Sequence, residues 1–166
     1  MKPDRKQMRR GGCYFEREPG APAPIAVRVT HRVCFGEVDP MAIVWHGNYP
    51  RLFELASAEL GRLCGLGYGD FFAANLRAPI IKLHIDYLHP LRLDEEVSIL
   101  ARLVWCEGAR INTEFELTRP DGLPAATGFT LQLFTDGATD EPVLVTPPML
   151  QHCRARWQAG EFAHLQ

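Results

Sequence analysis

The segment from Phe35 to Glu54 contains residue types whose spacing could support acyl-transfer chemistry. Asp39 lies seven residues before His46, and His46-Gly47 directly precedes the expected start of an amphipathic helix. The first turn of a helix has unpaired backbone N–H groups and a positive dipole end, so it can stabilise a carbonyl oxygen that gains negative charge. A carboxylate beside such a site indicates hydrolysis of an activated acyl group, with Asp39 as nucleophile or as base for water.

A long amphipathic helix is predicted after this pair. Its apolar positions, spaced three and four apart, are Tyr49, Leu52, Phe53, Ala56, Leu60, Leu63 and Cys64. Asn48 is expected to cap the first turn with its side chain, Pro50 is tolerated there, and Gly65 with Gly67 ends the helix. We interpret Tyr49, Leu52 and Phe53 as core rather than substrate pocket, because the helical spacing already accounts for them.

Alternating apolar residues predict five strands. They cover residues 27–35, 81–87, 97–105, 111–117 and 127–133. In the first strand Val27 through Phe35 alternate on one face, and in the fourth Asn112, Glu114 and Glu116 are expected to face water. The last four strands are joined by short connections, which favours an antiparallel sheet. One long helix can bury its apolar stripe only against that sheet, so the fold class is α+β with one central helix, followed by a short terminal helix from Pro147-Pro148 to about Trp157.

Composition and charge are those of a soluble globular chain. The 166 residues are 46% hydrophobic and 23% charged, with a net charge of −2, which predicts one domain over residues 25–166. Residues 1–24 are polar, basic and rich in Pro, so we expect a flexible leader or a crossing arm. No basic stripe favours nucleic acid as a partner, and no apolar run suits a signal peptide or integral membrane association. The cytoplasm is the default localisation.

Cysteine and histidine spacing argues against a metal or redox centre. Five cysteines form an odd number with no Cys-x-x-Cys pair, and we interpret them as reduced thiols. The six histidines form no helical ligand pair. We therefore predict no metal site.

Two blocks of the sequence carry a family resemblance. The first is Phe35 to Glu54, in which an Asp precedes a Val-containing segment and an Asn-Tyr helix start, and the second is Asp86-Tyr-Leu-His-Pro-Leu-Arg-Leu-Asp-Glu-Glu96. Together they resemble hot-dog-fold acyl-CoA thioesterases, in the branch of 4-hydroxybenzoyl-CoA thioesterase and the Tol-Pal-associated acyl-CoA thioesterase. The resemblance covers about residues 25–157, and two motifs in the right order are more specific than either alone. It implies a hot-dog fold, in which an antiparallel sheet wraps around one long central helix.

The resemblance also implies roles for particular residues. It makes Asp39 the catalytic carboxylate, and His46 and Gly47 the source of backbone N–H groups that polarise the thioester carbonyl. In the Tol-Pal-associated branch a catalytic His stands at the position of His46. Two residues depart from the family pattern: Phe35 replaces a Tyr four residues before the Asp, and Ala42 replaces a Gly, where a positive φ would strain an alanine.

The implied substrate is an acyl-CoA with a short-chain or aromatic acyl group. Coenzyme A would be part of the substrate, and no separate cofactor is expected. Lys82, Arg92, Arg102 and Arg110 are candidates for binding its phosphates. The resemblance further implies a homodimer or homotetramer with active sites at subunit interfaces.

Two other functional classes stay open. A non-catalytic acyl-CoA-binding or sensing protein of the same fold would need no carboxylate at the thioester carbon, whereas this chain has Asp39. A hydroxyacyl-thioester dehydratase would pair a His in a Gly- and Pro-rich loop with an acid on the helix, and here the acid precedes the His. Thioester hydrolysis is therefore the preferred hypothesis.

Overall fold

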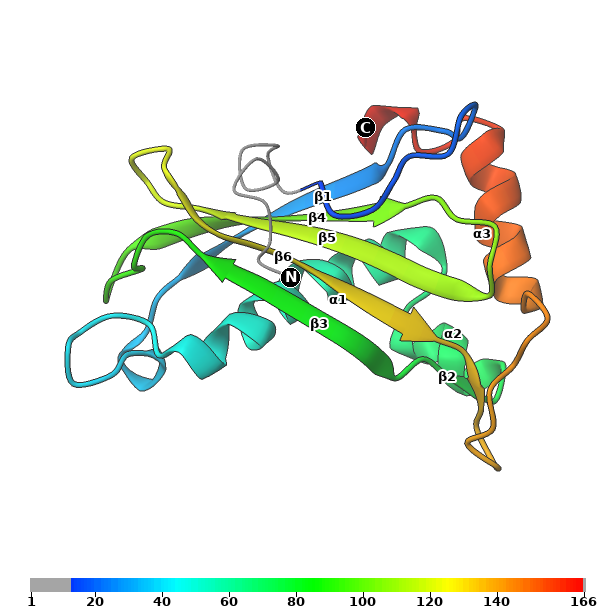
Figure 1. Cartoon of the computed structure of the whole chain (residues 1–166), viewed down its shortest axis with the longest axis horizontal. Coiled ribbons are helices and arrows are strands. Elements are labelled where there is room, and N and C mark those ends of the chain that lie inside the picture. The colour runs from blue at the N-terminus through cyan, green and yellow to red at the C-terminus, as the bar shows by residue number, and fades with distance from the viewer. Residues whose placement is uncertain (1–12, 166) are drawn as a thin grey trace, which may run out of the picture.

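A long helix lies across one face of a five-stranded antiparallel sheet (Figure 1) in the computed structural model, which describes residues 13–165. The strands are β1 (Ile25–Arg32), β3 (Ile80–Tyr87), β4 (Glu96–Val104), β5 (Arg110–Thr118) and β6 (Pro124–Leu133), in the spatial order β1-β4-β5-β6-β3. The predicted α+β class with one central helix is therefore confirmed. None of the helices in the described range is long and apolar enough to cross a membrane.

The central helix α1 (Tyr49–Cys64) has the predicted bounds and buried face. Its apolar stripe packs against the sheet, and the ring of Phe53 stacks on that of Phe115 in β5 at 4.4 Å. Gly65 ends the helix with a φ of 74°, a left-handed conformation that glycine adopts at little cost. The prediction for Asn48 was wrong: its side-chain amide donates to the backbone oxygen of Glu37 at 2.9 Å instead of capping the first turn.

Several short elements had no clear sequence signal. They are the helix α2 (Tyr68–Ala73), the paired strands β2 (Leu76–Arg77) and β7 (Thr135–Asp136), and the 3-10 turns η2 (Phe35–Glu37), η3 (His46–Asn48) and η4 (Ala163–Leu165). The predicted terminal helix is present as α3 (Pro148–Gln158). The short helix α2 folds back against α1, and it therefore contributes to the site described below.

The first strand is shorter than predicted. β1 ends at Arg32, and Phe35 lies in the turn η2 with 82% of its surface exposed. The apolar alternation continues past the strand only because Val33 turns into the core. This early end leaves the following residues free to form the loop that carries Asp39.

The sheet face opposite α1 is partly covered by the N-terminal segment, so the expectation that Asn112 and Glu114 face water was wrong. Both are buried, and Glu114 is only 1% exposed. The backbone N–H groups of Tyr14 and Phe15 donate to Glu114 at 2.7 and 2.9 Å, and Arg17 forms an ion pair with it at 2.5 Å. From Tyr14 to Arg17 the leader is thus a crossing arm, while its first 12 residues lie outside the described range.

The strand β3 forms one edge of the sheet. It pairs with β6 on one side, and its other edge has no partner strand within residues 13–165. Its large apolar side chains are about half exposed: Ile80 50%, Ile81 49%, Leu83 45% and Tyr87 51%. Apolar residues on an unpaired edge favour association with another strand.

Candidate active site

The carboxylate of Asp39 is held in a compact loop between β1 and α1. Its backbone N–H donates to the carbonyl of Ile43 at 2.8 Å, and its Oδ1 accepts the backbone N–H of Met41 at 2.8 Å. Such a turn fixes the carboxylate by its own backbone. Within the described residues Oδ2 has no hydrogen-bond donor, so this oxygen is free to act on a substrate or a water.

The loop depends on a left-handed residue at Ala42, whose φ is 59°. An L-residue with a Cβ pays a steric cost in this conformation, which glycine avoids. The departure from the family pattern noted in the sequence therefore falls on a strained backbone position. The strain sits three residues from Asp39, inside the turn that orients it.

We expect Ala42→Gly to stabilise the protein. Removing the steric cost of the left-handed alanine should raise the free energy of unfolding by about 1–2 kcal/mol. The greater freedom of glycine in the unfolded chain should lower it by about 0.5–1 kcal/mol. The net gain should raise the melting temperature by a few degrees at most, about 2–4 °C per kcal/mol for a chain of this size. Asn75→Gly is the matched control, because asparagine at a φ of 51° already tolerates this region. A lower melting temperature for Ala42→Gly than for the wild type would contradict the assignment of strain.

Glu37 anchors the base of the loop. Its carboxylate accepts from His31 Nε2 and from the backbone N–H of Cys34, at 2.9 and 2.8 Å, and its own carbonyl accepts the N–H of Trp45 at 2.9 Å. Burial alone would raise the pKa of Glu37, but the hydrogen bonds from His31 and Cys34 outweigh it and hold the pKa below its ordinary value of 4.5. Glu37 thus connects the end of β1 to the start of α1.

The lowered pKa of Glu37 makes the loop sensitive to acid. The stability from its charged form is complete above the ordinary pKa of 4.5 and is lost as the pH falls through the lower folded-state pKa. We therefore expect the melting-temperature difference between the wild type and Glu37→Gln to be largest near neutral pH and to shrink below about pH 4.3. Thermal unfolding across this range measures it. A difference that stays constant with pH would show that the charge of Glu37 contributes nothing.

His46 and Gly47 lie in the turn η3, directly before α1. Within the described residues, their backbone N–H groups donate to no loop or turn carbonyl. The hydroxyl of Tyr87, at the end of β3, donates to the carbonyl of His46 at 2.9 Å. The Trp45 ring lies over Gly47 so closely that a Cβ there would collide with it. A side chain at position 47 would therefore require the half-exposed Trp45 ring to move.

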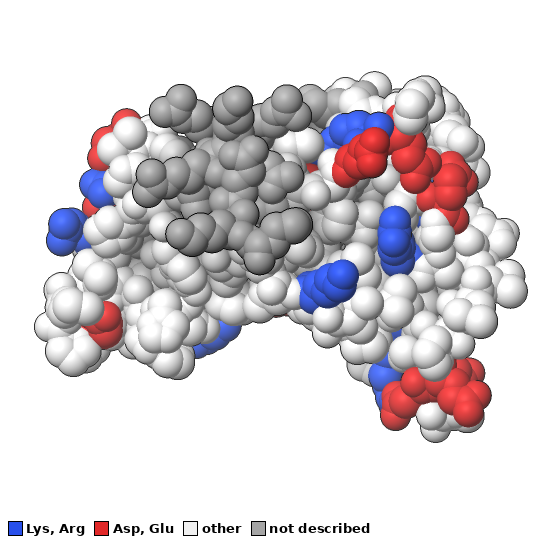
Figure 2. Space-filling view, in the orientation of Figure 1, with Lys and Arg blue, Asp and Glu red and all other residues white. Residues whose placement is uncertain are grey.

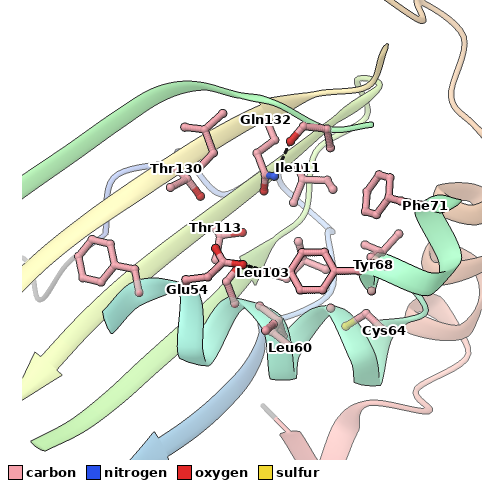
Figure 3. Close-up of a pocket in the computed structure, with 18 of the residues that line it drawn as sticks. Glu54, Leu60, Cys64, Tyr68, Phe71, Leu103, Ile111, Thr113, Thr130 and Gln132 are labelled. Carbon is pink, nitrogen blue, oxygen red and sulfur yellow. Dashed lines mark hydrogen bonds between the residues drawn. The ribbon is translucent and has the colours of Figure 1, made fainter. Parts of the chain in front are cut away.

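A cavity of about 350 Å³ lies between α1, α2 and the sheet (Figure 3). Its lining is mostly apolar and includes Leu60, Cys64, Phe71, Leu103 and Ile111. It runs along the side of α1 that faces β3, and Ile80 and Leu83 of that edge strand also line it. We call this space the helix–sheet cavity. Its size and apolar lining suit a compact acyl group.

The polar groups in this cavity were not identified from the sequence. Glu54 on α1 accepts a hydrogen bond from the hydroxyl of Tyr68 on α2, and Thr113 and Thr130 contribute from the sheet (Figure 3). Burial raises the pKa of Glu54 above its ordinary value. Phe53 also lines the cavity, although we had interpreted it as core. The only sequence signal was an acidic residue directly beside the apolar stripe of the helix.

The four basic candidates for coenzyme A lie apart from one another. Arg92 pairs with Ile43 in an isolated bridge and so lies beside the Asp39 loop. Arg102 forms an ion pair with Glu116 at 3.3 Å, whereas Lys82 and Arg110 are exposed on β3 and β5. Figure 2 shows scattered basic side chains on the described part of the visible face. Arg92 is therefore the best placed of the four. Within residues 13–165 no group of three His, Cys, Asp or Glu residues could hold a metal ion.

The fold and the loop at the start of α1 define a hot-dog protein of the thioesterase class. The model of the thioesterase-like superfamily matches residues 33–153, which is more than half of the chain. The chain therefore belongs to the thioesterase-like superfamily, and the expected class of thioester hydrolase is confirmed at this level.

The individual relatives described next have low sequence identity to this chain. A Bacillus subtilis (strain 168) protein named "Putative acyl-CoA thioesterase YneP" is 22% identical over 111 residues, covering 67% of this chain and 80% of the relative. Among solved structures, the DHNA-CoA thioesterase from Staphylococcus aureus has a TM-score of 0.73 at 21% identity, covering 84% of this chain and 95% of the other. A second Staphylococcus aureus protein, solved in complex with CoA, has a TM-score of 0.71 at 16% identity over 86% and 88% of the two chains. These structural likenesses show the hot-dog fold.

Proposed function

We propose that this protein is an acyl-CoA thioesterase that hydrolyses a short-chain or aromatic acyl-CoA through Asp39. The observation that carries the proposal is the loop geometry, which holds one oxygen of Asp39 by the Met41 N–H and leaves the other free, close in sequence to the first turn of α1. The apolar helix–sheet cavity offers a place for the acyl group. The names of relatives, which include acyl-CoA, DHNA-CoA and gentisyl-coenzyme A thioesterases, support the substrate class.

The chemistry needs few groups. The N–H groups of His46 and Gly47 stabilise the oxyanion that forms when the thioester carbonyl is attacked. If Asp39 attacks, the carbon–sulfur bond breaks, coenzyme A leaves as a thiolate, and water then opens the mixed anhydride. If Asp39 acts as base, it takes a proton from the water that attacks. A thiolate leaves readily because a thiol has a pKa near about 8.5, so neither route needs a strong general acid or a separate cofactor.

The site is completed by a second copy of the chain. In such a dimer the β3 strands of the two subunits pair antiparallel, so the start of one β3 lies opposite the end of the other. The start of β3 lines the helix–sheet cavity. At that end Tyr87 binds the carbonyl of His46. A homodimer through β3 therefore brings the Asp39 loop of one subunit toward the cavity of its partner. The exposed apolar side chains of β3 become buried in the same step.

Thiol release from a panel of acyl-CoAs tests this function. Acetyl-CoA, octanoyl-CoA, palmitoyl-CoA and benzoyl-CoA are each incubated with the protein, and free thiol is measured over time. Release from at least one short-chain or aromatic substrate is expected. Binding without release would favour the non-catalytic acyl-CoA-binding class, and hydration of an enoyl-CoA without release would favour the dehydratase.

A further inference from the structure

The helix α2 is attached to α1 through a glycine-rich joint. Gly65 has a φ of 74°, and Gly67 directly precedes α2. Gly61 is also required, because a Cβ there would lie 2.7 Å from the backbone oxygen of Leu66. The close turn folds α2 back so that Tyr68, its first residue, lies beside α1 (Figure 3).

Tyr68 stands between two hollows of the surface. It lines the helix–sheet cavity, and it also lines a second hollow between β1, α1 and α2 that includes Val29, His31 and Leu55. Only Ala58 and Gly67 are shared in the same way, and both are too small to separate the two spaces. Tyr68 is therefore the one large side chain that borders both hollows.

A hydrogen bond holds this ring in place. The hydroxyl of Tyr68 on α2 donates to Oε1 of Glu54 on α1. On the inner side of α2, the ring of Phe71 stacks on that of Phe134 at 5.6 Å and anchors the helix to the core. The Tyr68 side chain itself is 62% exposed, so its position depends on the bond to Glu54 more than on burial.

We propose that the ring of Tyr68, held by Glu54, is the wall that ends the helix–sheet cavity and limits the length of the acyl group that the enzyme accepts. This inference rests on the proposed function, because it assigns the cavity to the acyl group. A cavity of about 350 Å³ lies near the lower end of the range for small-ligand pockets, about 300–1,000 Å³, so a long chain would extend beyond it. Loss of the ring joins the cavity to the second hollow.

The test compares chain-length profiles of the full-length wild type, Tyr68→Ala and Tyr68→Phe. For each, kcat/KM is measured with saturated acyl-CoAs from acetyl to palmitoyl. Tyr68→Ala should move the fall in kcat/KM to longer chains and raise the ratio of palmitoyl to hexanoyl turnover about tenfold or more, since one methylene alters discrimination roughly tenfold or more. Tyr68→Phe keeps the ring but loses the hydrogen bond to Glu54, so its profile should shift in the same direction as that of Tyr68→Ala, by a smaller amount.

A binding measurement keeps the two hypotheses separable. Saturated fatty acids of the same lengths are titrated into each variant by calorimetry, which reports the length limit without any hydrolysis. If no acyl-CoA is cleaved but Tyr68→Ala still binds longer fatty acids than the wild type, the proposed function is rejected and the role of Tyr68 in limiting chain length is supported. If acyl-CoAs are cleaved and the Tyr68→Ala profile is unchanged, the role of Tyr68 is rejected and the proposed function is supported. If no chain binds or reacts in any variant, both are overturned.

Folding is checked by melting temperature for every variant. Should Tyr68→Ala unfold, Tyr68→Leu replaces it, because leucine keeps apolar contact while removing the ring and its hydroxyl. Leu144→Ala is the control for loss of a large exposed side chain, since Leu144 is 89% exposed and lines neither hollow. Its length profile should equal that of the wild type. A shift in this control would mean that the profile reports general destabilisation, and the wall would then be rejected.

Discussion

Asp39→Asn should reduce the kcat of thioester hydrolysis by roughly 10²–10⁴-fold, the usual contribution of a positioned base. Asparagine keeps an Oδ1 that accepts the N–H of Met41, so the turn and the fold should survive. It cannot take a proton from water, and it is a poor nucleophile. The change therefore removes the chemistry while leaving the geometry. Steady-state thiol release at saturating acyl-CoA measures the loss in kcat directly.

The control for this experiment is Glu96→Gln, which neutralises an exposed carboxylate at the start of β4. Its activity should stay within about twofold of the wild type, because surface substitutions away from a site have small effects. The melting temperatures of both variants should match the wild type within a few degrees. Wild-type turnover in Asp39→Asn would eliminate Asp39 as the reacting carboxylate.

Ile81→Asp should convert the proposed homodimer to monomers and abolish most hydrolysis at low protein concentration. Ile81 is half exposed on the edge strand β3 and does not line the helix–sheet cavity. Two aspartates brought together across a strand pair would repel each other and lose solvation, whereas two isoleucines bury apolar area. If the site is shared between subunits, activity should fall with the fraction of dimer. At a protein concentration about two orders of magnitude below the new dissociation constant, the loss should be roughly fiftyfold.

Light scattering after size-exclusion chromatography gives the oligomeric state, and the activity is measured at the same concentrations. Leu123→Asp is the matched control, because Leu123 is 46% exposed in the turn between β5 and β6, away from the β3 edge. It should leave both mass and turnover unchanged. A fully active Ile81→Asp monomer would show that each chain carries a complete site, and the shared-site model would have to be abandoned.

The elements with strong periodicity could be predicted, since burial on one face imposes a repeat that the sequence records. The helix α1 has its predicted bounds because an apolar stripe, a Pro in the first turn and Gly65 all agree. The neighbours of each strand could not be predicted in the same way. The strand β3 pairs with β6 rather than with β4, which follows it in sequence, and no local pattern records that choice. Burial of Glu114 was missed because its partners lie about 100 residues away.

The candidate site was only half visible in the sequence. The Asp39 loop lies within one continuous segment, so its carboxylate and the proposed backbone donors could be suggested from spacing and from the family resemblance. Their roles stay predictions. Glu54, Tyr68 and Thr113 come together only through folding, because α2 turns back at Gly65 and β5 lies across from α1. The hydrogen-bond partner of the Asn48 side chain could not be predicted from the sequence either. Its amide donates to the carbonyl of Glu37, which lies within reach only when the loop is folded.

The arm that reaches Glu114 has a consequence for the order of folding. The contact between the Tyr14 backbone and Glu114 spans 100 residues of chain, so closing it carries a large loop entropy that local hairpins do not face. The β5–β6 hairpin that presents Glu114 is joined by a short turn and can form early. The backbone N–H groups of the arm can then bind the Glu114 carboxylate on the formed sheet. We therefore expect docking of the arm to be a late step, after the sheet has formed.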